Sequence, residues 1–180
     1  MPGGNQVVAA VEAQGATNLY MLDLRGNVIR QLTRGSAINV SPAVSTDGAM
    51  LAFASDRGGK PQIYVMSTGG GDARRITYKG EYNTDPVFSP KGDQIAYQSR
   101  EGGGFNIYRI STGGGTPIAV TAGQHPAWSP DGRYIAFSIG RGSGLGLYLI
   151  DGDGGRVVGN LTTEEDGNAT DPSWSWWLGE

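Results

Sequence analysis

The feature that most constrains this chain is an internal repeat, because the same pattern returns about every 44 residues. The run Asp-Pro-Val-Phe-Ser-Pro at 85–90 reappears as His-Pro-Ala-Trp-Ser-Pro at 125–130, with shorter copies beginning at Ser41 and Asp171. Two further series of residues keep the same spacing: Tyr20, Tyr64, Tyr108 and Tyr148, and Thr33, Thr77, Thr121 and Thr162. A period of this length indicates one supersecondary unit, repeated, in which each copy buries its apolar faces against its neighbours.

Each repeat divides into short extended segments separated by turns. In the third repeat we expect strands at 127–129, 134–138, 147–150 and 157–162, and in 134–138 aromatic and β-branched residues alternate with small ones, as a strand buried on both sides requires. The residue six places after each marker tyrosine is glycine, which predicts a positive φ in a tight turn at Gly26, Gly70, Gly114 and Gly154. No segment shows a helical period, so we predict an all-β protein.

Repeated four-stranded antiparallel meanders of this length are typical of a β-propeller. The N-terminal part lacks a first strand and the C-terminal part supplies only a first strand. We therefore predict four blades, closed by pairing of the C-terminal strand with the N-terminal blade. The alternative is a portion of a longer propeller, either open or assembled with a second copy. The predicted single domain spans 1–180, with repeats near 40–83, 84–123 and 124–169 and a split repeat of 7–39 plus 170–177.

Several of these segments carry a family resemblance. Ser-Pro-Asp-Gly-Arg-Tyr-Ile-Ala-Phe-Ser at 129–138, Ser-Asp-Arg-Gly-Gly at 55–59, Gln-Ile-Tyr-Val-Met at 62–66 and Arg-Arg-Ile-Thr at 74–77 are similar to the propeller repeats of the TolB family. The same repeat occurs in the propellers of prolyl-oligopeptidase-like enzymes. The resemblance implies a noncatalytic periplasmic scaffold that contacts a lipoprotein. It also implies six blades, so the alternative fold is part of a longer six-bladed propeller.

Composition removes several classes of function. A net charge of -3 and a pI near 5.1 argue against nucleic acid as a partner. No apolar run approaches the roughly 18 residues of a membrane helix, and nothing at the N-terminus reads as a signal peptide. We expect an exported protein shown without its leader, with a cytoplasmic location as the alternative.

Catalytic chemistry is poorly supported by the residues present. The chain has no cysteine, and His125 is its single histidine, so neither a thiolate nor a multi-histidine metal site can form. A Gly-x-Ser-x-Gly elbow is also missing. We predict no enzymatic activity, no catalytic residues, no metal and no cofactor.

Binding is expected on the rim that carries the longer, chemically varied loops. Aromatic, arginine and carboxylate side chains together suit recognition of a protein or peptide. The alternative is that the aspartates accept backbone hydrogen bonds and the arginines bridge neighbouring blades. The expected partner-binding residues are Arg57, Arg100 and Arg141 from loops within the repeats, and Tyr82, Asp85, His125 and Asp171 from connections between repeats.

Three functions therefore remain open at this point. The favoured one is a protein-binding scaffold, monomeric if the ring closes and dimeric if it does not. The second is the gating propeller of a peptidase-like enzyme. The third is a propeller that binds a small ligand or ion in its central channel, for which the candidate lining residues are Ser45, Ser89, Ser129 and Ser175.

Overall fold

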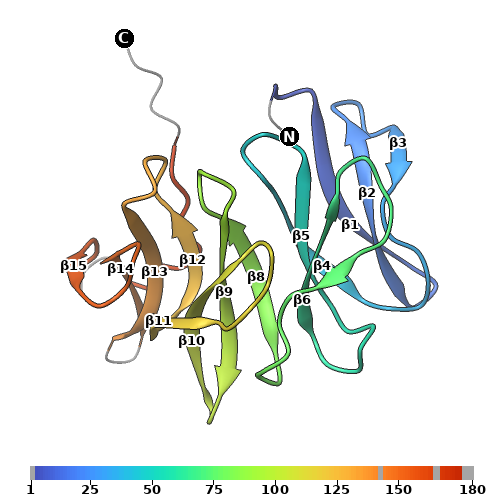
Figure 1. Cartoon of the computed structure of the whole chain (residues 1–180). Helices are drawn as coiled ribbons and strands as arrows, with labels where there is room; N and C mark the ends of the chain where they lie inside the picture. Colours follow the sequence, from blue (N-terminus) through green and yellow to red (C-terminus); the bar gives the residue numbers. More distant parts are fainter. Residues whose placement is uncertain (1–2, 142–143, 164–166, 176–180) are drawn as a thin grey trace.

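The computed structural model describes residues 3–141, 144–163 and 167–175 of the 180-residue chain, with Arg141 described by its backbone alone. These residues form β-strands joined by turns and loops, and they contain no helix. Four antiparallel sheets follow one another along the chain and stand side by side (Figure 1). The predicted all-β propeller architecture is confirmed, and each sheet is called a blade below.

Three blades have four strands and the first has three. In each complete blade the strands pair in chain order, so the first strand forms one edge and the last strand the other. The first blade comprises β1 (Gln6–Ala13), β2 (Ala16–Asp23) and β3 (Val28–Gln31). The second comprises β4 (Asn39–Val44), β5 (Met50–Ser55), β6 (Gln62–Ser67) and β7 (Arg74–Arg75). The third comprises β8 (Asn83–Phe88), β9 (Gln94–Glu101), β10 (Gly104–Ser111) and β11 (Ile118–Ala122). The fourth comprises β12 (Gln124–Trp128), β13 (Tyr134–Arg141), β14 (Gly144–Asp151) and β15 (Val157–Asn160).

The repeated glycines adopt the backbone conformation that the sequence predicts. Gly26, Gly70, Gly114 and Gly154 have φ values of 85°, 99°, 91° and 83°. A side chain is disfavoured in this left-handed region, which explains why glycine returns at the same turn of every repeat.

The core consists of layers between neighbouring blades. Strand β5 shows the pattern: Leu51 and Phe53 pack toward the first blade, while Ala52 and Ala54 pack toward the third. A third cluster, which includes Ile107, Ile135 and Phe137, joins the third blade to the fourth. Because successive side chains of a strand point to opposite faces, a strand buried on both faces reads as a nearly continuous apolar run.

The innermost strands carry a repeated irregularity. The pairing of β4, β8 and β12 with the next strand shifts register at the residue that precedes the proline, which marks a β-bulge. Four residues followed by proline have a left-handed backbone: Ser41, Asp85, His125 and Asp171, with φ between 51° and 53°. Asp and His are among the residues that tolerate this region best, although even they rarely adopt it.

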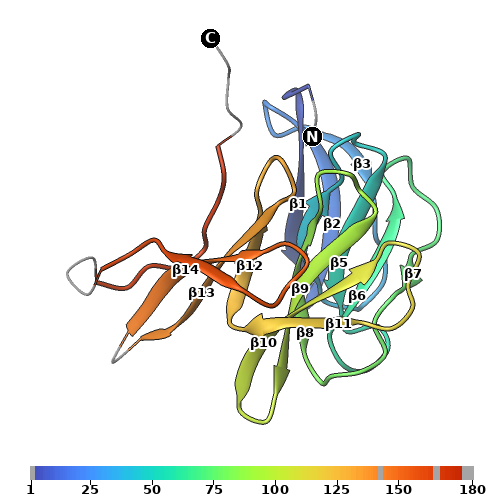
Figure 2. The same ribbon diagram turned by 60° about the vertical axis from the view of Figure 1, so that its left-hand side comes forward.

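The predicted closure of the ring is not observed. Residues 170–175 form no strand, and Trp174 Nε1 donates to the carbonyl of Ala127 in β12 at 3.0 Å. This segment is tied to the fourth blade, because Leu145 N donates to Asn168 Oδ1 at 2.8 Å and Ala169 N donates to Leu145 O at 3.0 Å. It lies at the opposite end of the array from β1 (Figures 1 and 2). The expected strand extended over 176 and 177, which lie outside the described residues.

Candidate functional site

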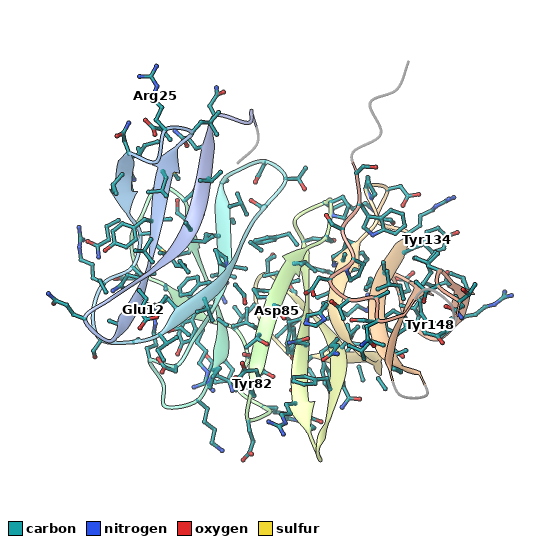
Figure 3. The ribbon with its side chains drawn as sticks, turned by 180° about the vertical axis from the view of Figure 1, so that it is seen from behind. Glu12, Arg25, Tyr82, Asp85, Tyr134 and Tyr148 are labelled. Carbon is teal, nitrogen blue, oxygen red and sulfur yellow. The ribbon has the colours of Figure 1, made fainter. Side chains whose placement is uncertain are left out.

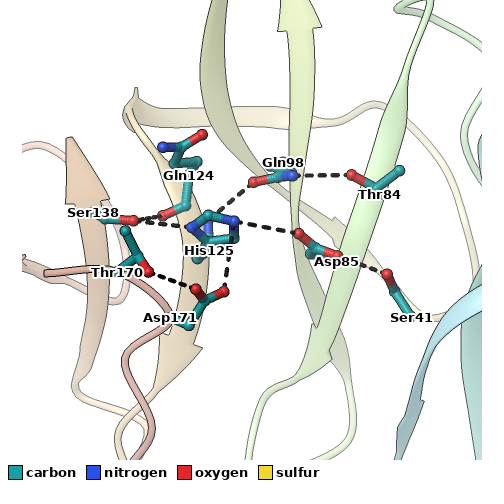
Figure 4. A network of polar contacts seen from close by, with 9 residues as sticks. All are labelled: Ser41, Thr84, Asp85, Gln98, Gln124, His125, Ser138, Thr170 and Asp171. Carbon is teal, nitrogen blue, oxygen red and sulfur yellow. Dashed lines mark hydrogen bonds and ion pairs between the residues drawn. The ribbon is translucent and has the colours of Figure 1, made fainter. Parts of the chain in front are cut away.

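The four residues that precede prolines form a row of polar side chains across the inner strands, called the pre-proline row below. Ser41 Oγ donates to Asp85 Oδ1 at 2.6 Å (Figure 4). His125 Nε2 lies 3.6 Å from Asp171 Oδ1 and 4.0 Å from Asp85 Oδ2. The sequence assigned Asp85, His125 and Asp171 to one rim, and the structure brings all three together. Ser41 was not among the predicted residues, although its place before Pro42 was the signal that could have found it.

The orientation of the His125 ring is set by its neighbours. Its Nδ1 lies 3.1 Å from Ser138 Oγ, and Ser138 Oγ donates to Gln124 O at 3.1 Å. With the hydroxyl proton used in that way, Nδ1–H is the donor to Ser138, and the contacts of Nε2 with the two carboxylates are ion pairs only when the ring is protonated. The backbone N–H of His125 donates to Gln98 Oε1 at 3.0 Å. The ring is therefore positioned by both sides of the junction between the third and fourth blades.

A cavity lies between the inner strands next to the pre-proline row. Its volume is about 430 Å³, and its lining includes Val44, Phe88, Trp128 and Trp174. The serines expected to line the channel do not do so: Ser45, Ser89 and Ser129 are buried in turns, where each hydroxyl donates to an aspartate at 2.6–2.8 Å. Ser175 is exposed. Polar groups thus gather at the pre-proline row, beside an aromatic interior.

Tyr82 and Arg100 line a second cavity of about 630 Å³ at the rim between the second and third blades. Lys60, Glu81 and Glu101 complete its polar lining. Lys60 Nζ pairs with Glu81 Oε1 at 2.6 Å, and this contact lowers the pKa of the Glu81 carboxyl. Tyr82 is 43% exposed and lies on the same side of the molecule as Asp85, whereas Arg25 and Tyr134 lie on the opposite side (Figure 3). This rim therefore offers an exposed aromatic ring and charges of both signs.

Arg57 is held by contacts within its own blade. Its Nη2 donates to Asn39 Oδ1 at 2.7 Å and its Nε donates to Ser55 Oγ at 3.0 Å. The guanidinium carbon lies 5.2 Å from the centre of the Phe53 ring and 4.8 Å from that of Tyr64. Arg57 also borders a rim cavity of about 530 Å³.

The three predicted arginines are not equivalent by structure. Strand pairing places Ser55, Ser99 and Ser138 at the same position of the second strand in successive blades, each opposite the first paired residue of the innermost strand. Arg57 follows its serine by two residues and Arg100 follows its serine by one, so Arg100 does not occupy the position of Arg57 in the repeat. The side chain of Arg141 lies outside the described part of the structure.

Within the described ranges, no group of three or more His, Cys, Asp or Glu side chains could hold a metal ion. The same residues contain no helix long and apolar enough to cross a membrane.

Comparison with known proteins agrees with the fold and the repeat. The chain resembles TolB from Acinetobacter baumannii, with 28% identity and a TM-score of 0.83, over 96% of this chain and 44% of that one. A protein from Agrobacterium tumefaciens with a provisional TolB assignment matches with 27% identity and a TM-score of 0.77, over 90% of this chain and 59% of that one.

A curated relative is the protein TolB homolog from Chlorobium chlorochromatii (strain CaD3), which is 42% identical over 56 residues, 31% of this chain and 13% of the relative. This chain thus spans well under two thirds of the length of each of these relatives. The family described as the TolB beta propeller domain matches residues 1–178. The chain therefore belongs to the TolB β-propeller domain family.

Proposed function

We propose that this chain is a noncatalytic, exported binding scaffold that receives a protein or peptide on the rim around the pre-proline row. Membership of the TolB propeller family supports a protein-binding role in general. As the family resemblance implies, the protein works in the periplasm and its partner is a lipoprotein.

The pre-proline row is the observation that carries the proposal. Each residue in a sparsely populated backbone region costs on the order of 1–3 kcal/mol, and such residues cluster at functional sites. Here four equivalent positions carry that cost, and together they direct a hydroxyl, an imidazole and two carboxylates toward one place. A tight turn does not explain this, because the residues lie in or beside the innermost strands.

The surroundings of the row suit a protein surface. Tyr82 and Arg100 lie at the neighbouring rim cavity, and exposed aromatic and arginine side chains dominate the energy of many protein interfaces. The Asp171 side chain is 72% exposed, so hydrogen-bond donors of a partner can reach it. The side chains of Asp85 and His125 are less exposed, at 33% and 26%.

The test is capture of a partner from a periplasmic extract, with the captured protein then purified and titrated. Arg100→Ala and Asp171→Asn each should weaken binding roughly tenfold or more, as expected for the loss of an interface contact worth more than about 1.4 kcal/mol. Arg25→Ala is the matched control, because Arg25 lies on the opposite side of the molecule (Figure 3). If Arg25→Ala abolishes binding while the other two variants bind normally, the proposed face is wrong.

A further inference from the structure

The first blade lacks the strand that is innermost in the other three. Tyr20 and Tyr64 are the repeated tyrosines of the first two blades, and they lie opposite Ala9 in β1 and Phe53 in β5. Strand β1 therefore occupies the position of β5, β9 and β13, the second strands of the complete blades. Those three strands pair on both edges, whereas β1 pairs only with β2 among the described residues. One edge of β1 is thus left without a neighbouring strand.

The side chains of β1 are correspondingly exposed. Leu51 of β5 is fully buried, whereas Val7, which occupies the same place in the repeat, is 43% exposed. Ser55 is 1% exposed, and Val11 at its place in the first blade is 42% exposed. The strand thus keeps an accessible edge, with apolar side chains in contact with solvent, where the complete blades are covered.

Residues 169–174 are an innermost strand with the opposite deficiency. Asp171 precedes Pro172 and has a φ of 53°, within the 51–53° found before the prolines of β4, β8 and β12. The hydrogen bond from Trp174 Nε1 to Ala127 O holds this segment against β12. No strand pairs with it in the described part of the chain. The segment therefore has the backbone of an innermost strand at its proline, and it lacks a second strand beside it.

The two incomplete parts of one chain lie at opposite ends of the array (Figures 1 and 2). Two different copies of the chain can bring them together, because the open edge of one copy is complementary to the unpaired segment of the other. We propose that residues 169–174 of one copy pair with β1 of a second copy, and that two copies exchange this contact at both ends. A head-to-tail contact of this kind gives a closed assembly when the ring completes.

Each junction then becomes a complete four-stranded blade. Its innermost strand comes from one copy, and β1, β2 and β3 come from the other. With four sheets in each copy, the assembly contains eight blades. This number lies within the usual range of about four to eight for β-propellers. The closed ring also covers both open edges of β1, and an exposed edge is a template for pairing with another chain.

The second blade shows how the junction would bury the exposed valine. There Val44 of the innermost strand lies opposite Leu51, and both belong to the cluster that joins the first two blades. Trp174 has the place of Val44, three residues after the residue that precedes the proline. The same register therefore places Trp174 of one copy opposite Val7 of the other, and the indole covers the valine.

The junction also continues the pre-proline row. Within one chain the row runs from Ser41 through Asp85 and His125 to Asp171, and Ser41 Oγ donates to Asp85 Oδ1 at 2.6 Å. At the junction, Asp171 of one copy becomes the neighbour of Ser41 in the other. The Asp171 side chain, 72% exposed in the single chain, would gain a second neighbour besides His125. The row is thus completed only by the second copy.

The first test is the mass of the full chain in solution, measured by sedimentation at a series of protein concentrations. We expect a species of twice the chain mass of 18.9 kDa, in equilibrium with the single chain on dilution. The mass of a single chain at every concentration would overturn the inference. Masses above two chains would show that the head-to-tail pairing continues without closing, and would overturn the two-copy ring.

A disulfide test reads the predicted register directly. Ala43 lies opposite Ala52, and both pack in the same cluster, so the same register places Ser173 of one copy opposite Val8 of the other. Residues opposite each other in an antiparallel pair have Cα atoms about 4.5–5.5 Å apart, which is within disulfide range. The chain has no cysteine, so introduced thiols have no competitors. Val8→Cys and Ser173→Cys proteins, unfolded in urea and refolded together, should give a covalent dimer on oxidation, whereas either protein alone should not.

The control moves one thiol out of register. Glu12 lies four residues beyond Val8 on β1, roughly 13 Å away, so Glu12→Cys refolded with Ser173→Cys should give at least tenfold less covalent dimer. Equal yields in the two mixtures would show random collision and overturn the inference. A chain that carries both Val8→Cys and Ser173→Cys should form covalent dimers. An internal disulfide in a single chain would show closure by the chain's own segment and would equally overturn it.

A charge placed in the junction should separate the two copies. Val7→Lys puts an ammonium group under Trp174, at the place where Leu51 is fully buried in the second blade, and should weaken association tenfold or more. Val28→Lys is the matched control, because it makes the same change at a 61% exposed residue of β3, on the other edge of the same blade. Unchanged association in Val7→Lys, or equal weakening in both variants, would contradict the proposed junction.

None of these measurements uses the partner of the proposed function. A failed dimer test therefore leaves rim binding to be judged by the Arg100→Ala and Asp171→Asn variants, and failed partner capture leaves the association of two copies to be judged here.

Discussion

The second and third blades have the same strand order and the same kind of polar pair, Asn39 with Ser55 and Asn83 with Ser99, yet only in the second does an arginine hydrogen-bond to both members of the pair. Arg57 joins Asn39, Ser55 and two aromatic rings in the second blade. The third blade keeps the polar pair and the rings but has Glu101 in place of the arginine. The difference teaches that a repeat can preserve its strand pairing and its stacked rings while a single rim residue decides whether a buried polar pair receives hydrogen bonds from within its blade.

The largest loss of stability should come from removing Phe53, one of the two stacked aromatic residues of the second blade. Phe53 is fully buried between the first two blades, so Phe53→Ala should lower the free energy of unfolding by about 3–5 kcal/mol. It would also remove one of the rings beneath Arg57. Tyr97→Phe in the third blade keeps the ring and should cost less than about 1 kcal/mol. Urea denaturation measures both, and similar losses in the two variants would break the comparison.

Removing Arg57 from the second blade should cost more stability than removing Glu101 from the third. Arg57→Ala leaves Asn39 Oδ1 without its donor and should destabilise the protein by about 1–3 kcal/mol. Glu101→Ala removes an exposed carboxylate and should change stability by less than about 0.5 kcal/mol. Arg57→Lys tests whether the planar guanidinium is needed, because an ammonium group cannot donate to two acceptors in the same geometry. Its loss of stability should lie between those of Arg57→Ala and Glu101→Ala. A loss for Glu101→Ala as large as that for Arg57→Ala would show that the blades are not different in this respect.

The smallest effect concerns the turns after the innermost strands. In the second blade, hydrogen bonds from Ser45 Oγ and Ala49 N lower the pKa of Asp47 below its ordinary value. A carboxyl with a lowered folded-state pKa adds stability above its unfolded pKa of about 4, and this is lost as the pH falls through the folded value. Asp47→Asn should therefore show a shallower loss of urea midpoint between about pH 5 and pH 3 than the unmodified protein.

The third blade provides the control for that measurement. Lys91 stands where the second blade has Asp47, and Ser89 donates instead to Asp93. Lys91→Ala should leave the pH dependence between pH 5 and pH 3 unchanged, because lysine keeps its charge throughout this range. A change of slope in Lys91→Ala equal to that in Asp47→Asn would assign the effect to net charge rather than to the turn.

The repeat was enough to predict strands, turns and blades, because these depend on local alternation and on glycines such as Gly70 and Gly114 with positive φ. The left-handed backbone at Asp85 and His125 was not predicted, since it arises from bulged pairing between strands rather than from local sequence. The correspondence between rim residues of different blades could not be read from the sequence for a related reason. Loop residues keep no fixed spacing, and only strand pairing shows that Arg57 corresponds to Glu101.

The predicted ring closure, which is not observed, shows a different limit of prediction from sequence. Residues 170–175 have the sequence pattern of an innermost strand. However, Trp174 is hydrogen-bonded to the fourth blade, and so are Asn168 and Ala169, which directly precede this segment. Complementary sequence pieces indicate what could pair. They do not say whether the curvature of the array brings the pieces together.

The β-bulge before each proline affects which amino-acid substitutions these positions can accept. Because the proline offers no N–H to the strand ladder, strand pairing is interrupted there, and residues that tolerate a left-handed backbone can replace one another at the position before it. Serine, aspartate and histidine already occupy this same backbone position in different repeats. If the proposed function is correct, single exchanges at these positions are expected to change what the rim binds, one position at a time, while the sheet architecture stays the same.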